Sequence, residues 1–361
     1  MIYRHSLHDI FTFDIVDHRT AGLRRWFDIS DRYRAFRAPF DPGISPDLTI
    51  ELGPFTPSLS GCYVLDDEYH IKPNYFFLAR ETHKLGGAWQ FDAAGLDEER
   101  CKVRVNANWT GMPFVSGRVI DFFIHYMLTK RGYTLIHASA IALGNLAAVY
   151  AGRGGGGKTT IALGAVERHR FCFMGDNFIL CKDGHLFSFY SNLNMFGYNL
   201  RPAVWERLSK AERLRFGFWL QVYRLTGGYI KVFTPVSPWR VFPHALQDSA
   251  VLAVFNSLLT DQEFSCVPVD RAKVIGRTVS NQKLEFFPFV RHTGQYGCLF
   301  PRSDFARHWE AYEDSLYKNL PDNIPYYQMT MPRRICPEVI DRVLALYETE
   351  IGPPSLEEEK P

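Results

Sequence analysis

The chain has 361 residues, 46% of them hydrophobic, and a formal net charge of +2. Such a chain can bury a large core, either as one domain with additions or as two domains. Lys and Arg are spread along the sequence, so the charge balance disfavours nucleic acid and acidic membranes as partners.

The cysteines and the N-terminus indicate the cellular compartment. The seven cysteines are odd in number, widely spaced and never form Cys-x-x-Cys, which argues against a disulfide framework and a zinc site. The first residues include polar and acidic side chains where a signal peptide needs an apolar core, and no apolar run is long enough to cross a bilayer. We therefore expect a cytoplasmic protein.

The first 115 residues contain short apolar or aromatic runs separated by Pro, Gly and Asp, which predict β-strands. These runs lie at residues 10–13, 48–52, 63–65, 75–79 and 101–105. Leu48–Leu52 alternates apolar and polar residues, which is typical of a strand with one solvated face and favours an antiparallel sheet. The sequence therefore predicts a β-rich region over residues 1–115.

The pattern changes after this region. Apolar residues between Val119 and Leu128 recur at helical spacing, and Gly132 can end that helix. The next predicted elements are strands at 134–138, 140–143 and 146–150, a helix at 160–167 and a strand at 171–174. A glycine-rich loop separates the third of these strands from the helix. The order strand, loop, helix, strand is the context in which phosphate-binding loops occur.

The remainder of the chain is predicted to be mixed. A hairpin is expected around Asp183-Gly184, between the runs at 178–181 and 186–190. Helices are predicted at residues 203–214, 303–316 and 337–347. The tail, residues 351–361, is rich in Pro and Glu, which predicts disorder.

The glycine loop completes the pattern Gly-x-x-x-x-Gly-Lys-Thr directly after an apolar run. In such a loop the backbone N–H groups form an anion nest, and the following helix directs its positive end at the same point. The lysine adds a mobile cation, and the hydroxyl after it can bind magnesium. The residues predicted to bind the phosphates are Gly152, Arg153, Gly154, Gly155, Gly156, Gly157, Lys158, Thr159 and Thr160.

The same glycines also satisfy Gly-x-Gly-x-x-Gly, the dinucleotide-binding fingerprint, with Asp176 where a ribose-binding acid could lie. We favour the phosphate loop because Lys158 and Thr159 follow the last glycine, which the dinucleotide motif does not require. The fingerprint also normally opens its domain, whereas about 150 residues precede it here. A glycine turn that binds no ligand is the third interpretation.

Five further residues are candidates for chemistry. Asp176 ends the strand after the loop helix, where a magnesium-binding or proton-accepting acid is expected, although a turn residue would also fit. Asn177 could orient a metal-bound water or simply make the turn. His137 ends a strand near the loop and is either close to the phosphates or a hydrogen-bonded core histidine, and Ser139 shares its face. Arg153 could clamp a phosphate or point into solvent.

Three segments together resemble the HPr kinase/phosphorylase family and its bacterial relatives. They are His137-Ala138-Ser139, the loop at 152–160 and Gly175-Asp176-Asn177, in this order and at these separations. The resemblance covers about residues 117–200, and its specificity lies in the combination, because many NTPases share the glycine loop. It implies an α/β (α+β) fold, namely a phosphoenolpyruvate carboxykinase-like P-loop core of mixed sheet with flanking helices, preceded by the β-rich region.

The resemblance also implies roles for individual residues. By that likeness, His137 is the strand histidine, Lys158 the phosphate lysine, Thr159 a magnesium ligand, and Asp176 both a magnesium ligand and the catalytic base. ATP and Mg²⁺ are the implied cofactors. The family's paired aspartates are Asp176-Asn177 here, so one carboxylate is missing. No segment matches the one with which true HPr kinases run phosphorolysis, so only the kinase direction is implied.

We therefore expect an ATP-dependent kinase that transfers the γ-phosphoryl group to a hydroxyl, foremost a serine of a protein or peptide other than HPr. A small-molecule kinase of the same fold, acting on a sugar, amino acid or natural product, is the first alternative. A catalytically weakened nucleotide-binding regulatory module is the second. The expected organisation is residues 1–115 for acceptor or partner binding, 116–350 as the kinase domain with a C-terminal helical extension, and the tail. The resemblance suggests a homo-oligomer, and no membrane or nucleic-acid partner is expected.

Overall fold

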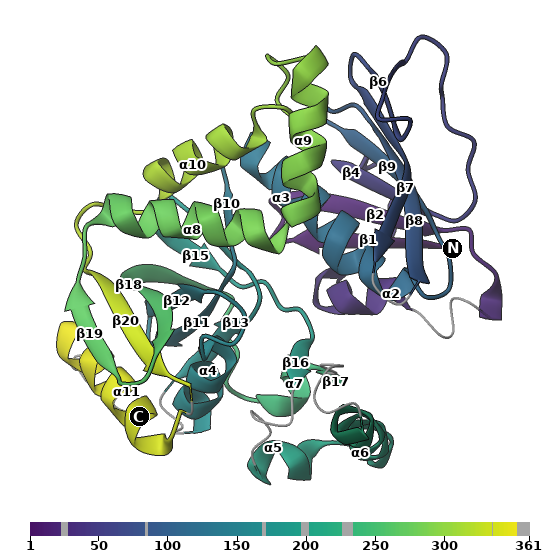
Figure 1. The fold of residues 1–361 in the computed structure, drawn as a ribbon. Coiled ribbons are helices and arrows are strands. Elements are labelled where there is room, and N and C mark those ends of the chain that lie inside the picture. Colours follow the sequence, from purple (N-terminus) through teal and green to yellow (C-terminus); the bar gives the residue numbers. More distant parts are fainter. Residues whose placement is uncertain are drawn as a thin grey trace. The chain divides into compact units, whose positions relative to one another are not determined.

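The structure is a computed structural model that describes residues 1–22, 28–83, 86–167, 171–195, 202–225, 234–333 and 335–351. It divides into two compact units (Figure 1). The first comprises Met1–Leu135 and Val279–Asn319, and the second comprises Ile136–Thr278 and Leu320–Pro361. The domain boundaries predicted near residues 115 and 350 stay predictions. The tail from residue 352, predicted to be disordered, lies outside the described residues.

The first unit is built on a nine-stranded mixed sheet in the order β3-β1-β2-β4-β9-β8-β7-β6-β5. Its strands are β1 Ile2–Leu7, β2 Phe11–Asp17, β3 Arg37–Ala38, β4 Leu48–Leu52, β5 Tyr63–Leu65, β6 Tyr69–Lys72, β7 Tyr75–His83, β8 Gly87–Ala94 and β9 Cys101–Ala107. The β-rich character predicted for this region is confirmed.

One pairing prediction in this sheet is wrong. β4 has the predicted alternation, with Leu48, Ile50 and Leu52 buried. It nevertheless pairs in parallel with both β2 and β9, not antiparallel. The alternation reports only that one face of the sheet is covered, and it carries no information on the direction of the neighbouring strands.

Helices cover one face of this sheet (Figure 1). The helical elements of the first unit are η1 Ile29–Phe36, α2 Met112–Val115, the π turn η3 Ser116–Ile120, α3 Asp121–Lys130, α9 Phe287–Leu299 and α10 His308–Asn319. The rings of Phe122 in α3 and Phe289 in α9 stack with centroids 3.7 Å apart. Aromatic packing of this kind fills the core between the helices and the sheet.

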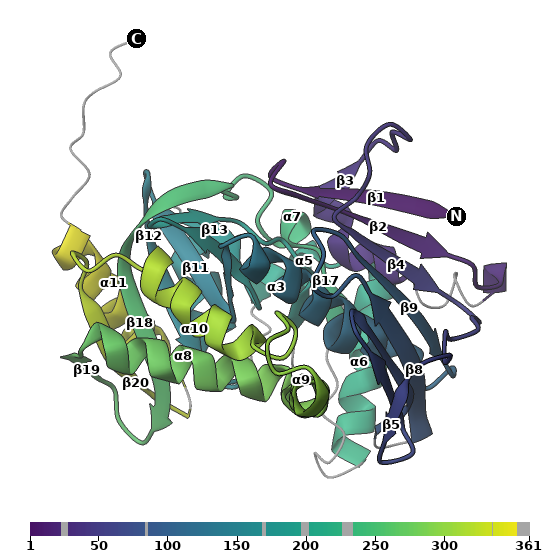
Figure 2. The same cartoon turned by 90° about the horizontal axis from the view of Figure 1, so that it is seen from above.

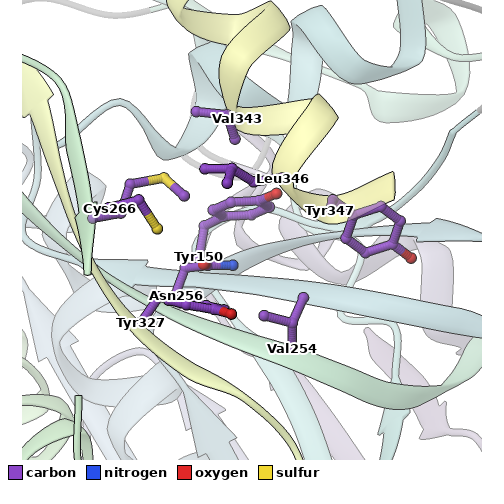
Figure 3. Close-up of a pocket in the computed structure, with 9 residues that line it drawn as sticks. Tyr150, Val254, Asn256, Cys266, Tyr327, Val343, Leu346 and Tyr347 are labelled. Atoms are coloured by element: carbon purple, nitrogen blue, oxygen red, sulfur yellow. The ribbon is translucent and has the colours of Figure 1, made fainter. Parts of the chain in front are cut away.

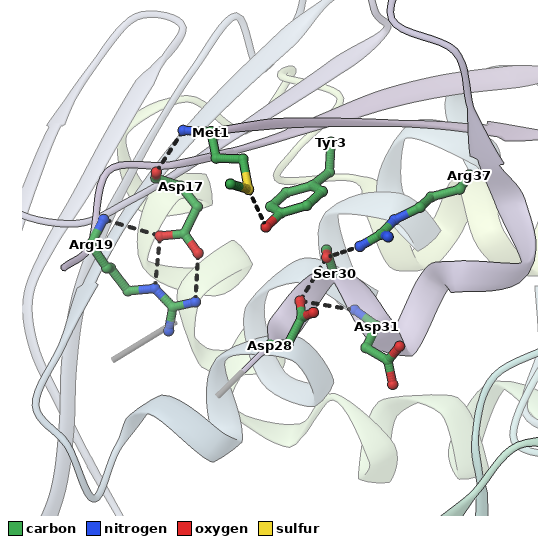
Figure 4. A network of polar contacts seen from close by, with 8 residues as sticks. All are labelled: Met1, Tyr3, Asp17, Arg19, Asp28, Ser30, Asp31 and Arg37. Atoms are coloured by element: carbon green, nitrogen blue, oxygen red, sulfur yellow. Dashed lines mark hydrogen bonds and ion pairs between the residues drawn. The ribbon is translucent and has the colours of Figure 1, made fainter. Parts of the chain in front are cut away.

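A polar network organises the N-terminal strands (Figure 4). The guanidinium of Arg19 donates two hydrogen bonds to the carboxylate of Asp17, at 2.9 and 2.7 Å, and both side chains are buried. The N-terminal ammonium of Met1 donates to the carbonyl of Asp17 at 3.0 Å. This bidentate pair anchors the chain where it leaves β2.

The second unit contains another nine-stranded mixed sheet, in the order β10-β14-β15-β18-β12-β11-β13, with β20 paired to β18 and β19 paired to β20. Its strands are β10 Thr134–Ile136, which spans the unit boundary after residue 135, β11 Ala138–Leu143, β12 Leu146–Gly152, β13 Cys172–Gly175, β14 Ile179–Lys182, β15 His185–Phe187, β18 Ser249–Asp261, β19 Ser265–Pro268 and β20 Tyr326–Pro332. Among these strands, Figure 2 labels β11, β12, β13, β18, β19 and β20. A separate small sheet pairs β16 Leu193–Met195 with β17 Thr234–Val236. The predicted hairpin around Asp183-Gly184 is confirmed by β14 and β15.

One helix predicted in the second unit differs from the structure. The helices of the second unit are α4 Lys158–Glu167, α5 Pro202–Arg207, α6 Lys210–Leu225, α7 Pro238–Val241, α11 Pro337–Ile351 and α8 Arg271–Glu285, which crosses into the first unit. The helix predicted over 203–214 is two helices, because Ser209 and Glu212 form a capping box that starts α6. In the first unit, the helix predicted over 303–316 is α10, which begins only at His308.

α4 and α11 pack together on one face of this sheet. A cavity of about 10 Å³ lies between α11 and the strands and is lined by Tyr150, Asn256 and Tyr347 among others (Figure 3). It has room for about one water molecule, so it is a packing gap and not a ligand pocket. Within the described residues no helix is both long and apolar enough to span a bilayer. The expected α/β class, with mixed sheets and flanking helices, is confirmed.

Candidate functional site

The glycine loop leaves the carboxyl end of β12 and enters α4, as the motif predicts. Gly155 and Gly157 have φ angles of +86° and +93°, which only glycine adopts without strain. A Cβ on Gly152 would lie 2.9 Å from the carbonyl oxygen of Leu258 in the neighbouring strand β18. The glycines therefore meet two local requirements, a left-handed backbone and a close approach of two strands.

The outer side of the loop is open to solvent. Arg153, Gly154 and Gly155 are exposed, and a Cβ on Gly154 or Gly155 would meet no atom within 4 Å. The first N–H groups of a helix have no acceptor within that helix, and α4 begins at Lys158. The loop thus presents backbone donors and the positive end of a helix dipole to an accessible space, which suits an anionic ligand.

Lys158 is held by the loop itself. Its ammonium donates to the carbonyl of Gly152 at 2.6 Å and to that of Arg153 at 3.3 Å, and the side chain is buried. In a phosphate-binding loop this lysine is the cation that contacts the β- and γ-phosphates. Lys158 is therefore already positioned at the loop before any ligand binds.

Asp176 and Thr159 form the central contact of the site. The Thr159 hydroxyl donates to Asp176 Oδ2 at 2.7 Å, and Asp176 is only 4% exposed. A P-loop hydroxyl and a strand-end carboxylate together form the magnesium site of P-loop NTPases. The two predicted magnesium ligands are thus adjacent in this structure.

Burial raises the pKa of Asp176, against the opposing effects of the Thr159 hydrogen bond and the charges of Lys158 and His137. A carboxylate with a raised pKa is a stronger base and is destabilised in its charged form until a cation arrives. The electrostatics of Asp176 therefore suit either a proton acceptor or a metal ligand.

His137 lies at a break between two strands, not within the single strand predicted over 134–138. The next residue, Ala138, pairs with Ala151, so the register places His137 beside the start of the loop. Its ring centroid lies 5.8 Å from that of Phe178. His137, Lys158 and Asp176, predicted as a group, are therefore brought together.

Asn177 takes a turn conformation with φ of +82°. Its amide donates to the Ser191 hydroxyl at 3.3 Å, and that hydroxyl donates to the carbonyl of Asp176 at 3.3 Å. Of the two roles considered for Asn177, these contacts favour the turn. Ser139 is fully buried, and its hydroxyl has no hydrogen-bond partner in the described part of the chain. The pairing of Ala140 with Gly175 places Ser139 next to Asp176 in register.

Sequence reasoning missed one arginine at the sheet edge from which the glycine loop departs. β12, β18 and β20 are parallel, so their carboxyl ends meet at the same edge. Arg333 directly follows β20, is exposed, and makes no ion pair within the described residues. The chain two residues further on reaches the loop, since a Cβ on Gly157 would lie 2.2 Å from Ile335 Cδ1. An apolar strand followed by Arg-Arg was the available signal.

The arrangement limits which metal could bind. Among the described residues no three His, Cys, Asp or Glu side chains cluster as a metal site. A magnesium ion needs fewer protein ligands, because it keeps several waters and shares substrate phosphates. Asp176 and Thr159 fit that ion and not a zinc ion held by protein alone.

Comparison with known proteins assigns no family, since no protein-family model and no curated protein matches the chain.

Proposed function

We propose that this chain is an ATP-dependent kinase with a phosphoenolpyruvate carboxykinase-like P-loop core. It would transfer the γ-phosphoryl group to a hydroxyl, foremost a serine of a protein or peptide. The observation that carries the proposal is the 2.7 Å contact between Thr159 and Asp176 beside the lysine of an open glycine loop. A strand-end carboxylate, a P-loop hydroxyl and a phosphate lysine are the parts that phosphoryl transfer requires.

The proposed mechanism assigns a task to each group, and two tasks to Asp176. The loop amides and Lys158 hold the β- and γ-phosphates of ATP and offset their charge. The acceptor oxygen bonds to the γ-phosphorus while the bond from that phosphorus to the β–γ bridging oxygen breaks. ADP leaves with the electron pair, and Asp176 takes the hydroxyl proton. Magnesium, when bound by Thr159 and Asp176, supplies further neutralisation of the phosphates.

A second candidate is a nucleotide-binding regulatory module. Asn177 stands where the resemblance expects a second aspartate, and its amide contacts Ser191. Asp176 is therefore the one carboxylate of the expected aspartate pair, which favours a module with weakened catalysis. The small-molecule kinase and the oligomeric assembly stay predictions of the resemblance.

The test combines ATP binding with transfer of label from γ-labelled ATP to hydroxyl-bearing peptides and small molecules. Asp176→Asn should keep nucleotide binding but lose about 10²–10⁴-fold in transfer rate. Lys158→Ala should weaken ATP binding, whereas Lys273→Ala, at an exposed lysine of α8, should not. Tight ATP binding without transfer to any acceptor would identify the regulatory module. Absence of ATP binding by the unmodified protein would refute both.

A further inference from the structure

Helix α6 (Lys210–Leu225) exposes an apolar stripe formed by Leu214, Phe218 and Leu225. Their exposed fractions are 75%, 62% and 86%. Spacings of four and seven residues place the three side chains on one face of a helix. The opposite face carries Phe216, which is buried and lies against Trp205 with ring centroids 6.0 Å apart. The helix therefore docks through Phe216 and turns the α6 stripe to solvent.

Cations flank the α6 stripe on both sides. At 3.6 residues per turn, Lys210 and Arg224 lie along one side of it and Arg215 along the other. All three are exposed, and none forms an ion pair within the residues that the structure describes. Glu212, the acid within α6, is engaged by Arg240 and by the Ser209 cap. The surface around the stripe is therefore cationic.

We propose that α6 is a docking surface for an anionic lipid bilayer, lying in the plane of the interface. An amphipathic helix with Leu and Phe on one face and Lys and Arg beside it buries the first in the acyl boundary and places the second on lipid phosphates. The overall charge of +2 conceals this patch, because acids elsewhere in the chain balance it. On the sequence, an acidic membrane is disfavoured only by the overall charge balance, which does not reveal this local patch.

Two other occupants fit less well. A second copy docked by a two-fold axis through the same face would bring Lys210, Arg215 and Arg224 of both copies together, which is repulsive. An acidic partner helix would match the charge, but a single helix offers no groove to receive it. A flat anionic bilayer can bury the apolar side chains of the α6 stripe and bind its flanking cations at the same time. The proposal does not depend on the kinase function.

The test is co-sedimentation of the full chain with vesicles. It should bind phosphatidylcholine vesicles that contain phosphatidylserine, bind pure phosphatidylcholine vesicles far less, and be released by salt. Leu214→Ser and Phe218→Ser should each lower the partition coefficient about tenfold. Arg215→Ala should lower it about fivefold. Leu284→Ser, at a leucine of α8 that is 49% exposed, is the matched control and should have no effect.

Each contrary result has a defined meaning. The proposal fails if the unmodified protein ignores anionic vesicles, or if Leu284→Ser weakens binding as much as Leu214→Ser. It also fails if Leu214→Ser instead abolishes self-association measured by sedimentation without lipid, which would identify a second copy. Binding to an acidic amphipathic peptide but not to vesicles would assign the surface to a protein partner.

Discussion

Alanine substitutions at three loop glycines separate backbone strain from steric contact. Gly154 has ordinary backbone angles and open space, so Gly154→Ala should leave stability unchanged or raise it by about 0.4–1 kcal/mol. Gly155 has a φ of +86° and open space, so Gly155→Ala should cost about 1–2 kcal/mol of strain. Gly157 combines a φ of +93° with an Ile335 methyl 2.2 Å from the added Cβ. Rotating that side chain off its rotamer adds about 0.5–1.5 kcal/mol, for a total of about 1.5–3.5 kcal/mol.

The assay is urea-induced unfolding of the three variants and the unmodified protein, followed by far-UV circular dichroism. Adding Ile335→Val to Gly157→Ala removes the methyl in question and should bring the cost down to that of Gly155→Ala. Equal unfolding free energies for Gly154→Ala, Gly155→Ala and Gly157→Ala would refute this description of the loop. So would a full cost for Gly157→Ala that Ile335→Val leaves unchanged.

Three further predictions concern charge. Asp176→Asn should raise the melting temperature of the nucleotide-free protein, because burial raises the pKa of Asp176 and so destabilises its carboxylate at neutral pH. An unchanged or lower melting temperature would contradict a destabilised carboxylate at this position. Burial also lowers the pKa of His125, and that of His308 to about 3. In the unfolded chain these histidines bind protons below about pH 6.5, whereas in the folded chain they stay neutral to lower pH. The free energy of unfolding should therefore be constant above about pH 6.5 and fall below it by up to about 1.4 kcal/mol per pH unit per histidine. Urea unfolding at several pH values measures this fall. Arg333→Ala should weaken ATP binding about tenfold, because we expect Arg333 to contact a phosphate. Arg302→Ala, at another exposed arginine, is the control and should leave ATP binding unchanged. Equal effects of the two substitutions would exclude a phosphate contact by Arg333.

The local motifs could be predicted because their physical causes are local. Gly155 and Gly157 are required by the backbone angles of the loop itself, and the loop ends where α4 can begin. The capping box of Ser209 and Glu212 is equally local, and the sequence contained it although the predicted helix ran through it. Asp176 was predicted correctly at a strand end, but its contact with Thr159 needed the pairing of β13 with β11.

Other features depend on which strands become neighbours. The alternation of Leu48–Leu52 indicates a covered face but not whether β2 and β9 run parallel to it. Arg333 lies at the same sheet edge as the loop only because β18 pairs in parallel with both β12 and β20, which are far apart in the chain. The sequence by itself determined the glycine loop, its lysine and hydroxyl, and the acid at the next strand end, since steric and hydrogen-bonding rules act over a few residues. Tertiary structure alone decided the strand order, and with it the arginine at the sheet edge beside the loop strand and the grouping of residues 279–319 with the first unit, because long-range pairing is set by the packing of whole sheets.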